Sequence, residues 1–496
     1  MLSVWLIAVG LNGAAVPVHT KPAAALGATA AARVSGSPPA ELATALFDPP
    51  SFSGADANLA FAHARQAGAS VVRLNLSWTT VAPSPLPALS NRSDPRNRGY
   101  DWQEVDREVE LAANAGLQPM LSVLGPPAWA RKPSAAGSTV LPELQNFADV
   151  GTFALAAAKR YSGSFARLPR VRYWEVWNEP NLSAYLAPQY SGGVPASPAI
   201  YRKLVNAVAA AVHSVHADNV VVAGGTSPFG KGDATTDPTR KHVVIGPMQF
   251  MRAFLCMSAG ARPKPTCTDR VAFDVWSHHP YTAGGPGHRA IRPGDVSLGD
   301  LPGMKALLDA AVKAGHVRSR GGVRFWVTEF SWDSKPPDPG AVPVTLEAQW
   351  ISEAIYRMWR AGVSLVTWFL IRDYDYGHFQ SGLYFAGPTV ADDRPKPALT
   401  AFRFPFVGHM VNGHVAVWGR TPWGKRGRVL VEESRSGTGG WTRLGVVATR
   451  PHGIFTQTFG ATRDAYVRAR LLGSTFSTVP FPLAGPADME VQPFGS

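Results

Sequence analysis

The chain has 496 residues, of which 45% are hydrophobic and 17% charged, a composition typical of a globular protein and not of a disordered or membrane-embedded one. Its length suffices for one large domain and a smaller one. The formal charge of +13 is spread along the chain without a dense basic run, which disfavours nucleic-acid binding. The same charge suits attraction to acidic glycans or to an anionic cell wall.

The chain begins with a short apolar run, Val4–Leu11, followed by alanine-rich sequence with several small-x-small sites. This pattern is typical of a secretory signal peptide and is too short to span a bilayer comfortably. The first basic residue is Lys21, after the apolar run, so an uncleaved anchor is the alternative. We expect residues 1–38 to be a signal peptide and a disordered segment, and the mature protein to be extracellular without a membrane span.

Two cysteines occur, Cys256 and Cys267. In an oxidising compartment they can close a small loop around Pro263 and Pro265 and stabilise it by about 3 kcal/mol. Two unpaired thiols are the alternative. Two cysteines alone cannot make a zinc site.

Residues 39–410 alternate between short β-prone runs and longer helical patterns, which predicts a (β/α)8 barrel. A doubly wound open sheet is the alternative, but no Gly-rich phosphate turn follows the first strand. The predicted strands are Leu42–Phe47, Ser70–Trp78, Leu117–Leu124, Val171–Glu179, Val220–Ala223, Val271–His279, Val323–Phe330 and Ser364–Leu370. The predicted helices are Asn58–Ala67, Trp102–Ala115, Glu143–Tyr161, Ala199–Val215, Met248–Met257, Pro302–Ala314 and Leu346–Ala361.

Residues 411–496 have a different texture, with short β-prone runs separated by Gly, Ser and Pro. This texture predicts a small all-β accessory domain, a sandwich. Its tryptophans Trp418, Trp423 and Trp441 either bind sugar or belong to a core that braces the barrel, and bracing is the favoured reading.

Two of the predicted barrel strands have a glutamate at their carboxyl ends. The fourth strand leads into Trp177-Asn178-Glu179-Pro180, and the seventh into Thr328-Glu329-Phe330. In a barrel these two strand ends lie across the same mouth, where barrel enzymes carry their chemistry. Paired carboxyl groups there are what a glycosidase needs, one as proton donor and one as nucleophile or base.

These two motifs resemble those of the clan A retaining glycoside hydrolases, the "4/7" barrels, with families 5 and 39 the most similar. The resemblance covers roughly residues 40–405. It implies that Glu179 is the acid/base, that Glu329 is the nucleophile and that Asn178 contacts the sugar 2-hydroxyl.

Further strand ends match the clan. Arg73 corresponds to the strand-two arginine that keeps the nucleophile ionised, although it also suits pairing with Glu175, which faces into the barrel by strand parity. The strand-six motif implies that Tyr281 bonds to Glu329 and that His279 lines the subsite.

Aromatic side chains are expected to form the sugar subsites, because a flat ring stacks on the apolar face of a pyranose. Trp368 resembles the tryptophan that floors the reactive-sugar subsite, and Trp129 is a candidate for a further one. Trp78 and Trp332 also lie just beyond strand ends, and packing is the simpler role for each.

A metal site is the rival reading of the histidines near strand six, His278, His279 and His288, although no carboxylate lies at close ligand spacing.

The sequence therefore predicts a secreted retaining glycoside hydrolase that cleaves O-glycosidic, β-type bonds of an oligo- or polysaccharide as a monomer, with no metal or organic cofactor in its two steps. A non-catalytic carbohydrate-binding or wall-associated barrel is the alternative from another class. A transglycosylase that uses the same two glutamates is a third. The long loops Ala82–Arg98, Leu182–Pro198, Ser227–Gly246 and Thr282–Val296 are expected to set sugar specificity.

Overall fold

The structure is a computed structural model that describes residues 38–85, 91–133, 143–230, 244–374, 379–460 and 465–491. The expected signal peptide and disordered segment, residues 1–38, lie outside these ranges apart from Pro38. Within the described ranges, no helix has the length and apolar character needed to cross a bilayer.

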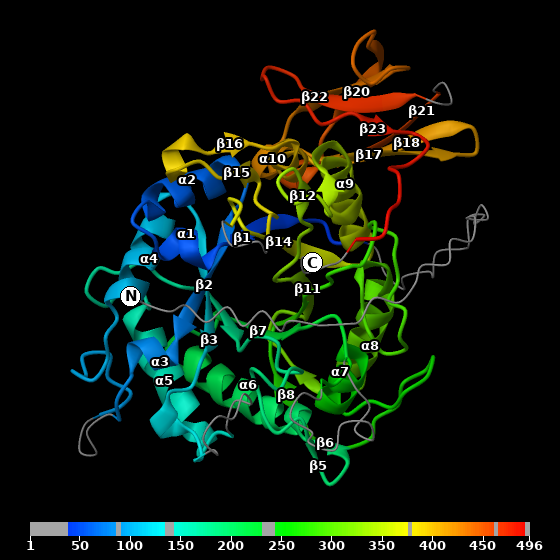
Figure 1. The fold of residues 1–496 in the computed structure, drawn as a ribbon. Coiled ribbons are helices and arrows are strands. Elements are labelled where there is room, and N and C mark those ends of the chain that lie inside the picture. Colours follow the sequence, from blue (N-terminus) through cyan, green and yellow to red (C-terminus); the bar gives the residue numbers. More distant parts are fainter. Residues whose placement is uncertain are drawn as a thin grey trace.

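Eight parallel strands close into a barrel, which Figure 1 shows beneath the orange and red sheets. Strands that follow one another along the chain are neighbours around the barrel, so the predicted (β/α)8 fold is confirmed and the open-sheet alternative is wrong. The barrel strands are β1 (Ala43–Phe47), β2 (Val71–Ser77), β3 (Gln118–Leu124), β4 (Tyr173–Val176), β7 (Val220–Thr226), β9 (Val275–His278), β11 (Arg324–Val327) and β14 (Val363–Phe369).

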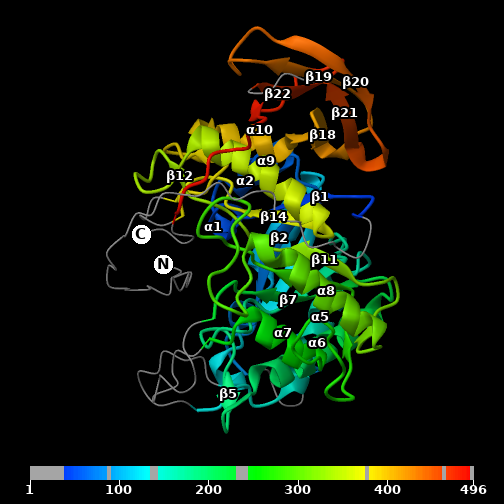
Figure 2. The same cartoon turned by 90° about the vertical axis from the view of Figure 1, so that its right-hand side faces the viewer.

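Helices cover the outside of the barrel (Figures 1 and 2). In α4, buried Val105, Val109 and Ala112 recur at helical spacing and face the strands. The helices are α1 (Pro49–Ser53), α2 (Ala57–Gln66), α3 (Trp78–Val81), α4 (Gln103–Asn114), α5 (Phe147–Arg160), α6 (Ser197–Val215), α7 (Pro247–Leu255), α8 (Leu301–Lys313), α9 (Val344–Arg360) and α10 (Pro397–Arg403). Short strand pairs in the loops are β5 (Tyr190–Ser191) with β6 (Val194–Pro195), β8 (Val271–Ala272) with β10 (Val317–Arg318), β12 (Ser334–Lys335) with β13 (Val342–Pro343), and β15 (Tyr384–Phe385) with β16 (Arg394–Pro395).

A cluster of apolar side chains fills the barrel interior, with a contribution from each of the eight strands. Its members are Ala43, Ala45, Val71, Met120, Tyr173, Val220, Val222, Val275, Trp326 and Leu365. Because side chains alternate along a strand, residues two positions further on face the same interior. From Val71, Met120 and Tyr173 these are Arg73, Ser122 and Glu175, so on β2, β3 and β4 buried polar side chains follow the apolar ones toward the carboxyl ends of the strands.

A bulge in β7 shapes the mouth. Gly224 has a φ of 106°, and a Cβ there would lie 2.2 Å from the carbonyl oxygen of Ser277 in β9, so this position requires glycine. The pairing register of β7 with β9 shifts between Ala223 and Thr226, around this glycine. The carbonyl oxygen of Gly225 then accepts a hydrogen bond from the backbone N–H of Glu179, at 3.0 Å.

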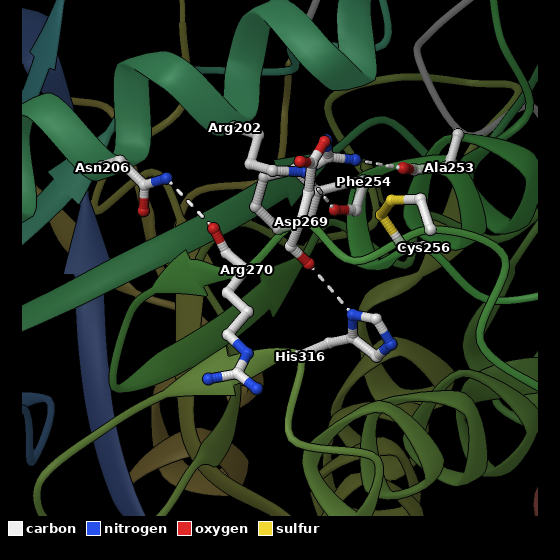
Figure 3. Close-up of a disulfide and its surroundings, with 9 residues drawn as sticks. Arg202, Asn206, Ala253, Phe254, Cys256, Asp269, Arg270 and His316 are labelled. Carbon is white, nitrogen blue, oxygen red and sulfur yellow. Dashed lines mark hydrogen bonds and ion pairs between the residues drawn. A yellow bond between two sulfur atoms is a disulfide. The ribbon is translucent and has the colours of Figure 1, made fainter.

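Cys256 and Cys267 form a disulfide, so the unpaired-thiol alternative is wrong (Figure 3). The buried Arg202 of α6 holds both ends of the same loop. Its guanidinium donates to the carbonyl oxygen of Phe254 at 2.9 Å and pairs with the Asp269 carboxylate at 2.5 Å. The disulfide therefore closes the loop, and Arg202 fixes its two ends to α6.

The C-terminal sheets form the predicted sandwich. Two sheets pack face to face, and a Cβ on Gly408 of one would meet the Val467 side chain of the other at 2.6 Å. The sheets begin at Phe406, ahead of the predicted boundary between residues 410 and 411. One sheet contains β17 (Phe406–Val411), β18 (His414–Arg420) and β21 (Ile454–Gly460), and the other β19 (Arg428–Ser434), β20 (Thr442–Ala448), β22 (Tyr466–Leu471) and β23 (Phe481–Pro482).

Two of the three sandwich tryptophans contact the barrel domain. Trp418 is buried against Tyr356 and Trp359 of α9, with ring centroids 5.4 Å away in each case. The indole N–H of Trp423 donates to the carbonyl oxygen of Arg65 in α2, at 2.8 Å. These two side chains are packed as braces, as the sequence favoured.

The bulge yields a stability prediction. We expect Gly224→Ala to lower the free energy of unfolding by at least about 3 kcal/mol, because the new Cβ meets a neighbouring backbone and also strains the φ angle. Urea unfolding measures the loss. Gly260→Ala is a matched control, since Gly260 has a φ of 103° but open space around its Cβ. It should cost only about 1 kcal/mol, from backbone strain. Equal losses in the two variants would show that the close approach of β9 is unimportant.

Candidate active site

The two predicted glutamates both lie just beyond the carboxyl ends of their strands. The fourth strand ends at Val176, three residues before its predicted end at Glu179, so that boundary was wrong. Trp177 and Glu179 have positive φ values of 72° and 41°, conformations that side-chain-bearing residues seldom adopt. The chain thus leaves the sheet in a strained turn, a feature that clusters at functional sites.

Arg73 is the centre of the site. Its guanidinium is fully buried and donates through Nε to the carboxylate of Glu175 and to Ser122 Oγ. Nη1 donates to Glu329 Oε2 at 2.9 Å, and Nη2 donates to Asn178 Oδ1 at 2.8 Å. The sequence left open whether Arg73 serves Glu329 or Glu175, and the structure shows that it bonds to both.

Glu329 receives a second hydrogen bond on its other oxygen. The hydroxyl of Tyr281 donates to Glu329 Oε1 at 2.8 Å. Burial and the neighbouring Glu329 carboxylate raise the pKa of Tyr281 well above its usual value, so this hydroxyl keeps its proton. Each Glu329 oxygen is therefore paired with a donor, as the match to Tyr281 and Arg73 implied.

His279 lies between the two glutamates. Its Nδ1 is 3.2 Å from Glu179 Oε1 and 3.9 Å from Glu329 Oε2, so these two oxygens are at most about 7 Å apart. Burial lowers the pKa of His279 to about 4, so the ring is neutral near pH 7. In the tautomer protonated on Nδ1, the Thr328 hydroxyl donates to Nε2 at 3.2 Å and His279 donates to Glu179.

Glu179 has an environment unlike that of Glu329. Burial raises the pKa of Glu179 from 4.5 to about 7, and the Coulombic attraction of Arg73 only partly opposes the shift. The hydrogen bonds of Arg73 go to Ser122, Glu175, Glu329 and Asn178 and not to Glu179. Two carboxyl groups at one mouth therefore have unlike partners, since Arg73 and Tyr281 both donate to Glu329 while burial favours the protonated form of Glu179.

Tyr185 joins the site and was not predicted as a site residue. It lies in the predicted specificity loop Leu182–Pro198, held by a hydrogen bond from the indole N–H of Trp177 to its carbonyl oxygen at 2.7 Å. A side-chain hydrogen bond from Asn178 lowers the pKa of Tyr185, while burial and the nearby glutamates raise it more strongly. The sequence carries no signal for Tyr185, because its loop meets the end of β4 only in the folded structure.

Trp368 does not line the mouth, so its predicted role as a subsite floor is wrong. Leu365 of the same strand faces the barrel interior, and by alternation Trp368 faces outward. Its side chain is 1% exposed, packs near Phe402 of α10 and donates its N–H to the carbonyl oxygen of Ser381. The inward residue at this strand end is Phe369.

The remaining tryptophans are packed more firmly than a sugar platform requires. Trp129 is partly exposed, with its edge against Trp78 and its N–H bonded to the carbonyl oxygen of Ala82 at 2.9 Å. Trp78 is buried, and Trp332 is buried with its N–H bonded to the carbonyl oxygen of Gly284. Of these three, only Trp129 keeps surface for a ligand.

The three histidines of the metal-site alternative have separate partners. His278 is bonded to Thr226 Oγ1 and to a backbone carbonyl, and His288 pairs with Asp488 at 2.8 Å. In the described part of the chain, the one group of side chains close enough to hold a metal comprises the disulfide cysteines and Asp269. The histidine metal site is therefore not formed.

A buried lysine ties together the loops beyond the seventh and eighth strands. Lys396 is 2% exposed, and its ammonium donates to Asp373 at 2.5 Å, to Ser334 Oγ at 2.7 Å and to the carbonyl oxygen of Gln380 at 3.0 Å. A desolvated ammonium needs this full set of acceptors, so the link is specific. It fixes the loops that border the mouth beside Glu329.

The chain resembles known proteins in structure but not in sequence. No family model and no curated protein matches the chain. Solved structures that it resembles include a family 39 glycoside hydrolase from Bacteroides cellulosilyticus WH2 (TM-score 0.48, 16% identity, 85% of this chain and 79% of that chain). Others are the GH39 enzyme from Xanthomonas axonopodis pv. citri (0.47, 14%, 88% and 94%) and a glucosidase from Croceicoccus marinus (0.46, 14%, 87% and 96%).

Family 39, which the sequence motifs resembled, is thus represented among these structures. At such identities and TM-scores the likeness carries no argument about chemistry. The fold rests on the strand pairing, and the chemistry rests on the geometry of the site.

The raised pKa of Glu179 yields a prediction about pH. In the window from about 4.5 to about 7 the folded protein holds a proton that the unfolded chain releases, so folding stability falls as the pH rises. Relative to the isosteric, neutral Glu179→Gln, the wild type should lose about 3 kcal/mol across this window. Urea unfolding of both proteins at several pH values measures the difference. A stability difference that stays constant with pH would contradict the shifted pKa.

Proposed function

We propose that the protein is a glycoside hydrolase that cleaves O-glycosidic bonds through a covalent glycosyl-enzyme. The observation that carries this proposal is the pair of unlike carboxyl groups, Glu179 and Glu329, on either side of one His279 nitrogen. Their oxygens are at most about 7 Å apart, a bound that includes the roughly 5 Å of retaining enzymes and excludes most of the wider range of inverting ones.

Glu329 is the proposed nucleophile. Arg73 and Tyr281 each donate to one of its oxygens, and hydrogen bonds to a carboxylate favour its charged form. The same two donors fix the carboxylate plane, so one oxygen is aimed at the anomeric carbon of a bound sugar. Attack forms an ester between Glu329 and that carbon.

Glu179 is the proposed acid in this first step and the base in the second. With a pKa near 7 it is substantially protonated at neutral pH and can give its proton to the departing glycosidic oxygen. Because Oε1 receives the His279 hydrogen bond, Oε2 is the oxygen that carries the proton. The resulting carboxylate then removes a proton from the water that hydrolyses the ester.

A sugar hydroxyl in place of that water would give transglycosylation from the same intermediate. Hydrolysis is proposed here because both steps need only the two carboxyl groups and solvent. The β-type linkage is inferred from the resemblance of the motifs to the 4/7 barrels.

Asn178 and Tyr185 are proposed to contact the reactive sugar. Asn178 uses Oδ1 to accept from Arg73 and its amide N–H to donate to the Tyr185 hydroxyl. The Tyr185 O–H is then left to donate to a sugar hydroxyl. The two side chains therefore contact the sugar together, because Arg73 orients Asn178 and Asn178 in turn orients Tyr185.

We also propose that the protein works outside the cell. The apolar segment near the N-terminus has the pattern of a signal peptide. A disulfide such as Cys256–Cys267 persists in oxidising compartments. Both features support export.

The assignment of Glu329 is tested by covalent trapping. A 2-deoxy-2-fluoro glycoside with a good leaving group slows the second step, so we expect mass spectrometry to find the sugar on the peptide that contains Glu329. Glu329→Ala should reduce turnover by at least about 10⁴-fold, because it removes the covalent route. Its circular dichroism and melting temperature serve as controls for folding.

Labelling of another residue would contradict the role given to Glu329. Binding of glycans without hydrolysis across a broad panel would contradict the proposed activity and favour the non-catalytic alternative.

A further inference from the structure

The outer face of the four-stranded sheet is separate from every contact described above. β19, β20 and β22 lie on the side of the sandwich away from the barrel, while β17 and β18 lie toward it (Figures 1 and 2). Trp418 and Trp423 are occupied in bracing, but Trp441 precedes β20 and belongs to this outer side. Its role is not explained by packing against the barrel.

Strand alternation places four arginines on this face. In β19, Val429 and Val431 are buried inside the sandwich, so Arg428 and Glu432 point outward. Glu432 is directly opposite Arg443 on β20 and Arg468 on β22, and residues that pair across strands share a face. In β22, Val467 and Ala469 are likewise buried, which turns Arg468 and Arg470 outward.

Glu432 organises these arginines and does not neutralise them. It is 7% exposed, with Arg468 Nε at 2.8 Å from one oxygen and Arg470 Nη1 at 3.6 Å from the other. The guanidinium carbon of Arg468 lies 4.1 Å from the centroid of the Trp441 ring. Arg468 is thus fixed by an ion pair and by stacking, and side chains held in place lose less entropy when they bind a ligand.

We propose that this face, defined by Arg428, Arg443, Arg468, Arg470 and Trp441, binds an anionic polysaccharide. Four guanidinium groups against one buried carboxylate make the face strongly positive, and guanidinium forks bind carboxylate or sulfate groups in a bidentate manner. A sheet face with the partly exposed aromatic surface of Trp441 suits an extended sugar chain. The choice of a glycan over other polyanions rests on the proposed glycosidase function, and the face would hold the barrel on its substrate.

Binding of full-length protein to polygalacturonate tests the proposal, with a neutral galactan as the reference ligand, by isothermal titration calorimetry. We expect the wild type to bind polygalacturonate and Arg443→Gln/Arg470→Gln to bind about tenfold more weakly, because two charge-assisted contacts are lost. Arg262→Gln/Arg270→Gln is the matched control. It removes the same charge from exposed positions on the barrel and should change Kd less than twofold.

Thermal unfolding checks that the double variant is folded, and Arg428→Gln tests the same face from β19 with an expected loss of about threefold. Equal weakening by the control pair would overturn the proposal, since attraction would then follow net charge alone. Unchanged affinity in the Arg443/Arg470 variant would also overturn it, as would tighter binding to double-stranded DNA than to polygalacturonate at the same salt.

These outcomes are independent of catalysis. Glu329→Gln should bind polygalacturonate as the wild type does, while it loses turnover. Failure to hydrolyse any glycan would therefore contradict the proposed activity and leave the binding result unchanged.

Discussion

The buried guanidinium of Arg73 is the constraint on which the site depends. Its hydrogen-bond acceptors come from three strands or their ends, and the guanidinium is fully removed from water. The acceptors are Ser122 of β3, Glu175 and Asn178 of β4 and its end, and Glu329 after β11. A buried cation is costly unless its donors are satisfied, so these acceptors cannot move independently. Glu175 is buried beneath the mouth and pairs with Arg73. Arg73 also pairs with Glu329, while Glu179 lies outside these ion pairs and has the raised pKa that burial imposes.

This arrangement requires irregular backbone at the mouth of the barrel. The turn after β4 places Trp177 and Glu179 at positive φ, and it is held by the Gly225 carbonyl that the β7 bulge presents. Gly224 permits the bulge because β9 approaches too closely for a side chain. Strain in one strand end and a bulge in its neighbour thus cooperate to aim one carboxyl group, a common use of irregular geometry beside active sites.

The sequence was most informative where a periodic pattern repeats. Eight alternations predicted the barrel, and strand parity predicted that Glu175 faces Arg73. The role of Trp368 was taken from the resemblance alone, and strand parity, which was not applied to it, places the residue on the outward face of β14. The end of β4 was placed three residues too late, since a positive φ leaves no trace in residue type when the residue is not glycine. Tyr185 was missed because a loop brings it back to Asn178.

The stereochemistry of hydrolysis tests the central claim, that Glu179 and Glu329 act as acid and nucleophile on one sugar, most directly. Proton NMR of the first-formed product, recorded before mutarotation on any glycoside that the enzyme cleaves, identifies its anomer. The proposed mechanism predicts that the product has the same anomeric configuration as the substrate, because two displacements retain configuration. The opposite anomer would contradict it, because water and not Glu329 would then attack the sugar.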